Sequence, residues 1–317
     1  MFPSNGRIGL TIVELLVVIA IVVILLSLAT TGVMMARERA RLAECQSNFR
    51  QIGLALAANE EKLGAFLILP NSAECFQPPF RKHKTTGGFS HLLPYLGFQT
   101  VYDQIPPCAY QLGSPEPTQP SVFRCPSDGQ DGGLNYRFCS GSKCCSRDQD
   151  LPPHYIPYDG VFPDIGTVRA SGITDGLSQT IGASERVQAS ETETFDRSSH
   201  IWNLGVTTPL DNTFFLKTCR TPPAEPLHFE RRVGRFWGYG WAPMQLYNHV
   251  APPNWAGTDC MSTPWTGSFR ASSRHAAGVG TLRMDGSVHF VPDSIDLVLW
   301  RSLATRAGQD DLKHVGQ

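Results

Sequence analysis

The first forty residues hold the longest apolar stretch of the chain. Residues 15–36 include no charged side chain over 22 positions. At about 1.5 Å per residue, a helix of this length covers about 33 Å, enough to cross the hydrocarbon core of a bilayer. Arg7 precedes the stretch, Arg37 follows it, and a single acid, Glu14, stands at its start. An acid at the edge of a membrane helix is costly without a partner, so the pattern predicts a membrane helix with a specific role for Glu14.

The helical pattern continues past the apolar stretch with a different spacing. Apolar residues recur at intervals of three and four at five positions: Leu42, Cys45, Phe49, Ile52 and Leu56. This spacing places them on one face of a helix. Such a face needs an apolar partner surface, most simply a sheet of the same chain, and a coiled coil with another chain is the alternative. Gly64 is the expected C-cap, which gives a first helix of about fifty residues.

The remainder is rich in turns. Gly 29 and Pro 24 with only 17 % charged residues favour short strands and many turns over a helical bundle. The local patterns predict strands at 160–162, 167–169, 180–185, 281–284 and 287–291, and short helices at 89–96 and 294–307. Asp285-Gly286 is a strong hairpin turn between the last two strands. We expect a loop-rich, disulfide-stapled segment at 121–150, and long surface excursions with aromatics underneath at 187–265.

Charge and cysteine content indicate an exported protein. Lys+Arg 27 against Asp+Glu 28 gives a net charge of −1, which argues against a nucleic-acid partner held by general electrostatics. Nine cysteines are many for a cytosolic protein but suit an exported one with disulfides. Because the number is odd, at least one cysteine is free or pairs with another chain. Cys45 is the expected odd one, since it lies on the long helix.

The remaining cysteines supply the disulfide candidates. We expect Cys125 to pair with one of Cys139, Cys144 or Cys145, and Cys219 to pair with Cys260, although sequence alone does not fix the connectivity. A zinc site built from Cys125, Cys139, Cys144 and Cys145 is the alternative. Their spacing lacks Cys-x-x-Cys, and adjacent cysteines seldom both bind one metal well. We therefore predict disulfides and no bound metal.

Other residues that could carry chemistry have simpler structural explanations. His275, Asp285 and His289 with nearby serines could form part of a hydrolase site, but no Gly-x-Ser-x-Gly elbow is present. Residues 128–132 are acidic and turn-like, yet lack the ligand run of an EF-hand calcium loop. We expect a turn at Asp175-Gly176, a surface pair at Glu185-Arg186, and no catalytic residues. Tryptophans within 187–265 could line a sugar-binding face, although a buried core is the simpler role.

The N-terminus resembles that of type IV prepilins and pseudopilins. The matching residues form one short run: Gly9, Leu10, Thr11, Val13, Glu14, Leu15 and Leu16. The resemblance implies that a prepilin peptidase cuts after Gly9 and methylates Leu10, and that Glu14 pairs with the terminal amine of a neighbouring subunit. A secretory signal peptide cut near Ala29, which would remove the helix, and a signal anchor that is never cut are the alternatives.

Landmarks along the rest of the chain resemble the DUF1559 family of prepilin-like proteins. They lie at 48–56, 88–96, 123–128, 135–136, 159–162, 173–180, 185–186, 273–278 and 285–288. The resemblance implies an α+β fold with a pilin-like long N-terminal helix, transmembrane in its first half, packed on an antiparallel β-sheet domain with long loops. It implies no known reaction. The expected division is a leader at 1–9, a transmembrane half-helix at 10–36, an amphipathic half-helix at 37–63 and an exported domain at 64–317.

These observations together predict a non-enzymatic subunit without a cofactor. We expect a single-pass inner-membrane protein whose C-terminal domain is periplasmic or at the cell surface, with prepilin peptidase and other pilin-like subunits as partners and no nucleic acid. The alternative is a monomeric anchored binding module that uses residues 187–265 to recognise a glycan or a protein. An anchored hydrolase is the third hypothesis.

Overall fold

The computed structural model describes residues 11–66, 87–105, 118–129, 133–144, 158–163, 167–206, 211–238, 240, 242–263 and 266–308. The chain divides into two compact units, Met1–Ala43 and Glu44–Gln317.

One helix, α1, runs from Ile12 to Leu63 over 52 residues. Its start is a capping box, in which a threonine and a glutamate three residues later satisfy each other's backbone N–H groups. The N–H of Thr11 donates to Glu14 Oε2 at 2.8 Å, and the Glu14 N–H donates to Thr11 Oγ1 at 3.3 Å. Its end is the predicted glycine, since Gly64 has a φ of 70° and its N–H donates to the Glu60 carbonyl at 2.7 Å. The expected helix of about fifty residues is therefore confirmed.

The first unit is a helical segment whose apolar side chains are exposed. Ile12 is 79 % exposed, Leu16 61 % and Leu28 66 %. Among the described residues, α1 is long and apolar enough to cross a membrane. Exposed apolar surface of this extent is typical of a segment that contacts a membrane or another protein.

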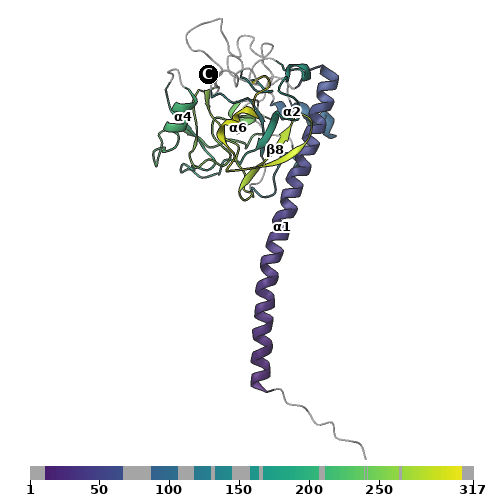
Figure 1. Ribbon diagram of the computed structural model, residues 1–317, viewed down its shortest axis with the longest axis vertical. Coiled ribbons are helices and arrows are strands. Elements are labelled where there is room, and N and C mark those ends of the chain that lie inside the picture. The colour runs from purple at the N-terminus through teal and green to yellow at the C-terminus, as the bar shows by residue number, and fades with distance from the viewer. Residues whose placement is uncertain are drawn as a thin grey trace, which may run out of the picture. The chain divides into compact units, whose positions relative to one another are not determined.

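The main sheet of the second unit holds five strands in the order β5-β1-β2-β8-β9. These strands are β1 (Tyr136–Cys139), β2 (Ile181–Glu185), β5 (Leu246–Tyr247), β8 (Gly278–Arg283) and β9 (Val288–Pro292). Figure 1 shows β8 and the short helix α6 (Leu297–Ser302) in this unit. Four of the strands pair antiparallel, but β5 runs parallel to β1. The expectation of an antiparallel sheet is thus wrong at this edge, because β5 returns only after a long crossover, which permits parallel pairing.

The part of α1 that belongs to the second unit packs on this sheet. Phe49, Ile52 and Leu56 are buried in one cluster with Tyr136 of β1 and Leu282 of β8. The rings of Phe49 and Tyr136 meet edge to face with centroids 4.6 Å apart. The predicted apolar face therefore finds its partner in a sheet of the same chain.

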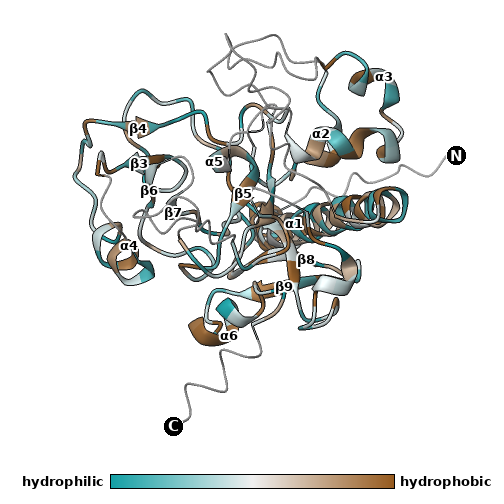
Figure 2. Ribbon diagram, turned by 90° about the horizontal axis from the view of Figure 1, so that it is seen from above, coloured by the Kyte–Doolittle hydropathy of each residue, from teal (hydrophilic) through white to brown (hydrophobic). Residues whose placement is uncertain are grey.

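A second sheet occupies much of the region for which we expected surface excursions. It has four strands in the order β4-β3-β6-β7, with β3 parallel to β6. The strands are β3 (Ile201–Asn203), β4 (Phe229–Glu230), β6 (Asp259–Thr263) and β7 (Thr266–Ser268). Figure 2 shows them grouped beside α4 (Asn212–Thr218), apart from β8 and β9. The expectation of surface excursions is therefore wrong for these residues. The strands were missed because they are short and pair mostly with distant segments, so they leave little local pattern.

The remaining elements are short helices, and two predicted strands are absent. The helices are α2 (Gly88–Leu92), α3 (Gln99–Tyr102), α5 (Ala242–Gln245), η1 (Leu93–Leu96), η2 (Ser121–Phe123) and η3 (Ala170–Gly172). Residues 160–162 form a bend in which Val161 and Phe162 are both fully buried, and residues 167–169 are irregular. Strand β1 lies in the segment predicted to be rich in loops. The hairpin of β8 and β9 and the helix α6 lie where the sequence predicted them, with α6 shorter than expected.

Candidate functional site

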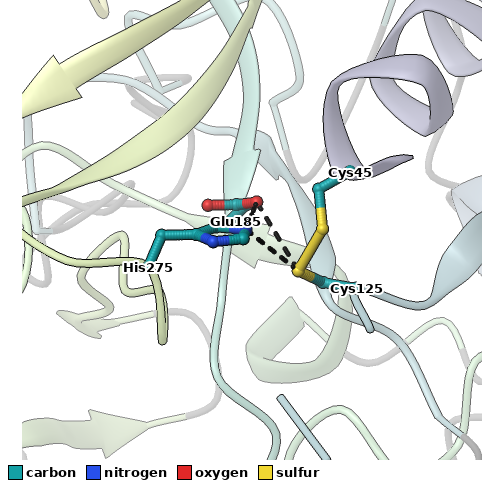
Figure 3. A group of neighbouring side chains, drawn as sticks. All are labelled: Cys45, Cys125, Glu185 and His275. Atoms are coloured by element: carbon teal, nitrogen blue, oxygen red, sulfur yellow. Dashed lines mark hydrogen bonds and ion pairs between the residues drawn. A yellow bond between two sulfur atoms is a disulfide. The ribbon is translucent and has the colours of Figure 1, made fainter. Parts of the chain in front are cut away.

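Four buried side chains with potential metal-binding or redox chemistry meet between α1 and the main sheet. Cys45 of α1 is bonded to Cys125, and Glu185 and His275 lie against the Cys125 sulfur (Figure 3). His275 Nε2 is 3.3 Å from Cys125 Sγ and 3.5 Å from Glu185 Oε1. Cys125 Sγ is 3.8 Å from Glu185 Oε1. One ligand atom from each of the four residues lies within 4.8 Å of all the others.

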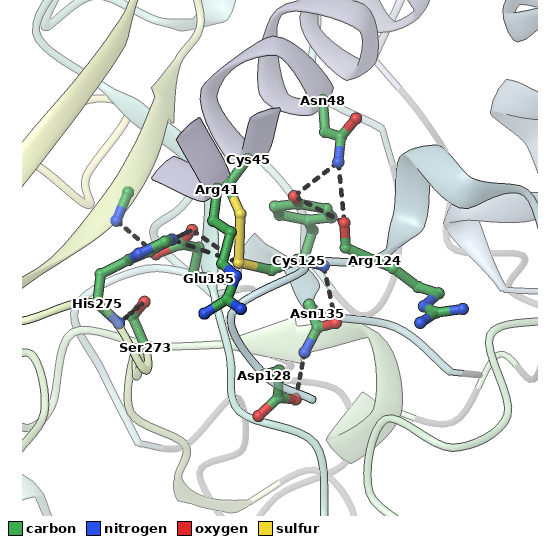
Figure 4. The surroundings of a disulfide bond; sticks show 12 residues. Arg41, Cys45, Asn48, Arg124, Cys125, Asp128, Asn135, Glu185, Ser273 and His275 are labelled. Atoms are coloured by element: carbon green, nitrogen blue, oxygen red, sulfur yellow. Dashed lines mark hydrogen bonds and ion pairs between the residues drawn. A yellow bond between two sulfur atoms is a disulfide. The ribbon is translucent and has the colours of Figure 1, made fainter. Parts of the chain in front are cut away.

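Backbone hydrogen bonds hold the Cys125 loop from both sides. The Cys125 N–H donates to Asn135 Oδ1 at 3.0 Å, just before β1 (Figure 4). On the other side, Asn48 of α1 donates from Nδ2 to the Arg124 carbonyl at 2.9 Å. Asn135 Nδ2 also donates to Asp128 at 2.6 Å, which fixes the turn that follows Cys125. The sulfur of Cys125 is therefore positioned by the helix and by the sheet.

Hydrogen bonds also position Glu185 and His275, the two ionisable neighbours of Cys125. Glu185 ends β2, and its Oε2 accepts the Gly280 N–H at 2.8 Å, so Oε1 is the oxygen nearest to His275. A Cβ at Gly280 would lie 3.1 Å from Glu185 Cδ and 3.0 Å from Phe49, so glycine makes the room for this carboxylate. The His275 N–H donates to Ser273 Oγ at 3.1 Å in the loop before β8.

The second described disulfide has different surroundings. Cys219 and Cys260 are bonded, with Cα atoms 6.1 Å apart, and they belong to a cluster of buried residues with Phe215 and Val250. Only the Cys45–Cys125 bond belongs to a group of potential metal ligands among the described residues. A disulfide needs no ionisable neighbours to be stable, so the histidine and the glutamate at Cys125 require a separate explanation.

The cysteine expectations are partly corrected. Cys45 is not the odd cysteine, and Cys125 does not pair with Cys139, Cys144 or Cys145. Cys139 is the free cysteine among the described residues; it is fully buried, and burial raises the pKa of its thiol to about 12. Cys144 is disulfide-bonded, and Cys145 lies outside the described residues. The pairing of Cys45 with Cys125 was missed because it joins positions 80 residues apart through tertiary packing alone.

The residues considered for a hydrolase do not form a catalytic triad among the described residues. Asp285 is exposed in the hairpin turn and accepts from Ser287 Oγ at 2.6 Å, and His289 Nε2 lies 3.0 Å from the same hydroxyl. In a catalytic triad the carboxylate orients the histidine, and the histidine contacts the serine. Here the Asp285 carboxylate contacts the serine directly. His275 lies instead at the Cys125 sulfur. Of the acidic loop considered for calcium, Asp128 is bonded to Asn135 and Arg274, and residues 130–132 lie outside the described residues.

The pair Glu185-Arg186 is buried, which corrects the expectation of a surface pair. Glu185 is 2 % exposed and Arg186 1 %. Arg186 Nη2 lies 2.6 Å from Asp259 Oδ2, and Arg270 donates from its backbone N–H to Asp259 Oδ1 at 3.1 Å. This ion pair joins the end of β2 to β6 of the second sheet. No local pattern indicates this ion pair, because Asp259 is far from Arg186 along the chain.

The predicted processing and assembly residues lie at the N-terminus. Gly9 and Leu10 lie outside the described residues. Glu14 is exposed, and Thr11 donates to its carboxylate from both the backbone and the hydroxyl at 2.8 Å. The capping box gives Glu14 a local role that is independent of any second subunit.

A surface cavity of about 290 Å³ is lined partly by the region considered for recognition and partly by residues within 270–274. Its lining includes Arg197, Asn254, Trp255 and Arg270. A second cavity of about 10 Å³ is lined by Cys125 and Glu185, and the two cavities share Val187, Ser272, Ser273 and Arg274.

Comparison with known proteins identifies a family but no function. One family model matches residues 34–298, more than half of the chain, and it is described as a protein of unknown function (DUF1559). No curated protein and no solved structure matches.

Proposed function

The chain belongs to the DUF1559 family of proteins of unknown function, and from this premise we propose that it is a non-enzymatic structural subunit of the pilin or pseudopilin type. Its N-terminal helix anchors it in the inner membrane, and its C-terminal domain lies in the periplasm or at the cell surface. A prepilin peptidase cuts after Gly9 and methylates Leu10, and the mature subunits gather through their apolar helices.

The exposure of the apolar part of α1 is the observation that carries this proposal. The helix continues without a break from the exposed apolar segment into the segment that packs on the main sheet. Residues of one helix therefore belong to both units. This architecture supports a domain displayed on a shared helical core, since large apolar side chains such as Ile12, Leu16 and Met35 are exposed.

Glu14 is the residue through which neighbouring subunits recognise each other. After cleavage, the new terminal amine lies four residues before Glu14, and a carboxylate at the edge of the membrane needs a cation beside it. The amine of an adjacent subunit supplies this cation and sets the register between the helices. The capping box with Thr11 presents the carboxylate at the helix start.

Mass spectrometry of the native, membrane-extracted protein tests the proposal. The expected N-terminal peptide begins at methylated Leu10, and cysteine pairs introduced in residues 15–36 are expected to cross-link between subunits in membranes. A mature chain that begins at Met1, or beyond the apolar stretch, contradicts the proposal. Cross-links that never form between chains contradict the assembly step alone.

The surface cavity favours a second candidate function, a monomeric anchored binding module. Trp255 offers a ring for stacking on a sugar, and Arg197 lines the same space. Glycan-array binding that Trp255→Ala abolishes, with the folded domain unchanged by circular dichroism, would support this candidate. A protein that cross-links into assemblies but binds no glycan favours the structural subunit.

A further inference from the structure

We propose that the cluster of Cys45, Cys125, Glu185 and His275 is a redox-controlled metal site. With the disulfide reduced, the two thiolates, one imidazole and one carboxylate bind a zinc-class divalent ion. With the disulfide formed, the ion is excluded.

Three of the six distances between the ligand atoms match those around a tetrahedral zinc ion, and all six are within 4.8 Å. Zn–N and Zn–O bonds of about 2.0–2.1 Å and Zn–S bonds of about 2.3 Å give edges of roughly 3.3–3.8 Å between ligand atoms. Three edges of the cluster, His275–Glu185, His275–Cys125 and Cys125–Glu185, measure 3.5, 3.3 and 3.8 Å. The edge between the two sulfurs is the one that must lengthen, to about 3.8 Å, when the covalent bond opens. The reduced cluster therefore needs a small movement of the Cys45 side chain.

The surrounding hydrogen bonds support this role. Gly280 donates to Glu185 Oε2 and leaves Oε1 on the side of the sulfur and the imidazole. The side chains of Asn135 and Ser273 accept hydrogen bonds from the backbone N–H groups of Cys125 and His275. Such outer contacts orient the ligands in metal sites. The two thiolates and the carboxylate carry three negative charges, of which a divalent ion neutralises two, so the ion offsets most of the cost of burying them.

A small cavity borders the site. This cavity, of about 10 Å³, is lined by Cys125 and Glu185 and shares Ser272 and Ser273 with the surface cavity of about 290 Å³. The cluster therefore lies close to a solvent-accessible space.

The redox step balances with a dithiol as the reductant. One thiolate of the dithiol attacks the Cys45–Cys125 bond, and its second thiolate releases the mixed disulfide. The dithiol loses two electrons and two protons and becomes a disulfide, while the Cys45 and Cys125 sulfurs gain both. Binding of the ion then displaces the two thiol protons to water.

Metal binding by the full chain in detergent tests the proposal. The protein is reduced with dithiothreitol without oxygen, desalted, and titrated with Co²⁺, whose absorption reports tetrahedral thiolate ligation, and then with Zn²⁺. We expect binding of about one ion per chain by the reduced protein and none by the oxidised protein. The matched control is Cys219→Ser with Cys260→Ser, which removes the other described disulfide and is expected to bind as the wild type does.

Variants of the two other ligands separate a metal site from a structural cluster. Glu185→Gln and His275→Asn are expected to bind at least about tenfold more weakly, whereas His275→Cys, which replaces one zinc ligand by another, is expected to retain binding. Mass spectrometry after alkylation is expected to show zinc protecting Cys45 and Cys125 in the reduced wild type. Equal zinc affinity of the reduced wild type and the Cys45→Ser, Cys125→Ser double variant overturns the proposal, as does protection of other cysteines instead.

Discussion

Cys45 and Cys125 are joined across 80 residues of chain, with Cα atoms 5.3 Å apart, so the long helix is covalently attached to the loop that leads into β1. Closing a loop of this length restricts the unfolded chain and is expected to stabilise the fold by about 4.5 kcal/mol, against about 4 kcal/mol for the 41-residue loop between Cys219 and Cys260. Both bonds therefore matter about equally for stability, although their surroundings differ.

The first prediction compares these two bonds. The pair of substitutions Cys45→Ser and Cys125→Ser is expected to lower the free energy of unfolding by about 2–5 kcal/mol, and Cys219→Ser with Cys260→Ser is expected to cost a similar amount. Chemical denaturation of the oxidised proteins measures both. A loss below 1 kcal/mol in the first variant would show that packing alone holds α1 on the sheet.

The second prediction separates two roles of Glu14. Glutamine can accept the same capping hydrogen bond from Thr11 but carries no charge. Glu14→Gln is therefore expected to keep the helix start and still impair cross-linking between subunits in membranes. Thr11→Ala removes only the cap, costs about 1 kcal/mol of helix stability, and is expected to assemble. Assembly of Glu14→Gln at the wild-type level would reduce Glu14 to a capping residue.

The third prediction concerns the buried ion pair between Arg186 and Asp259. Arg186→Met leaves the Asp259 carboxylate buried, where it is 1 % exposed, without the partner that lies 2.6 Å from it. The expected loss is about 3–5 kcal/mol in the free energy of unfolding. Arg235→Met, which breaks the exposed pair with Glu191, is the control and is expected to cost less than about 1 kcal/mol. Equal losses in the two variants would contradict a structural role for the buried pair.

The fourth prediction is a loss of stability in acid caused by His249. Burial lowers the pKa of this side chain to about 3, and its ring stacks on Trp300 with centroids 3.5 Å apart. The unfolded chain takes up the proton near pH 6.5, whereas the folded chain does so only near pH 3. Between these values the unfolded state binds more protons, so stability falls with decreasing pH by about 1.4 kcal/mol per unit and is unaffected above pH 6.5.

Denaturation of His249→Gln across this pH range measures the effect of His249. The slope of the free energy of unfolding against pH is expected to be smaller than in the wild type. The control is His289→Gln, which changes an exposed histidine and is expected to keep the wild-type slope. An unchanged slope in His249→Gln would assign the acid sensitivity to other groups.

The features that could be predicted from sequence are those set by neighbouring residues. The spacing of Phe49, Ile52 and Leu56 identified the face of α1 that packs on the sheet, and Gly64 and Asp285-Gly286 identified a helix end and a hairpin turn. Each of these follows from local backbone preferences and periodicity.

The features that could not be predicted depend on contacts between distant residues. The pairing of Cys45 with Cys125 requires the helix to be folded against the β1 loop, and the burial of Arg186 requires Asp259 from the second sheet. The parallel pairing of β5 with β1 likewise has no local signal. The candidate site was missed for the same reason, since its four residues come from four separate segments of the chain.

The position of the sulfur bridge also decides how the second unit responds to mechanical load. A force that pulls on α1 from its N-terminal end enters this unit at Glu44, one residue before Cys45. The covalent bond passes the tension directly to Cys125 and on to the main sheet. While the bridge is intact, residues 46–124 form a closed loop that this force cannot extend, even where the packing of Phe49 and Ile52 yields. Reduction of the bridge would leave that packing as the contact that resists extension of these residues.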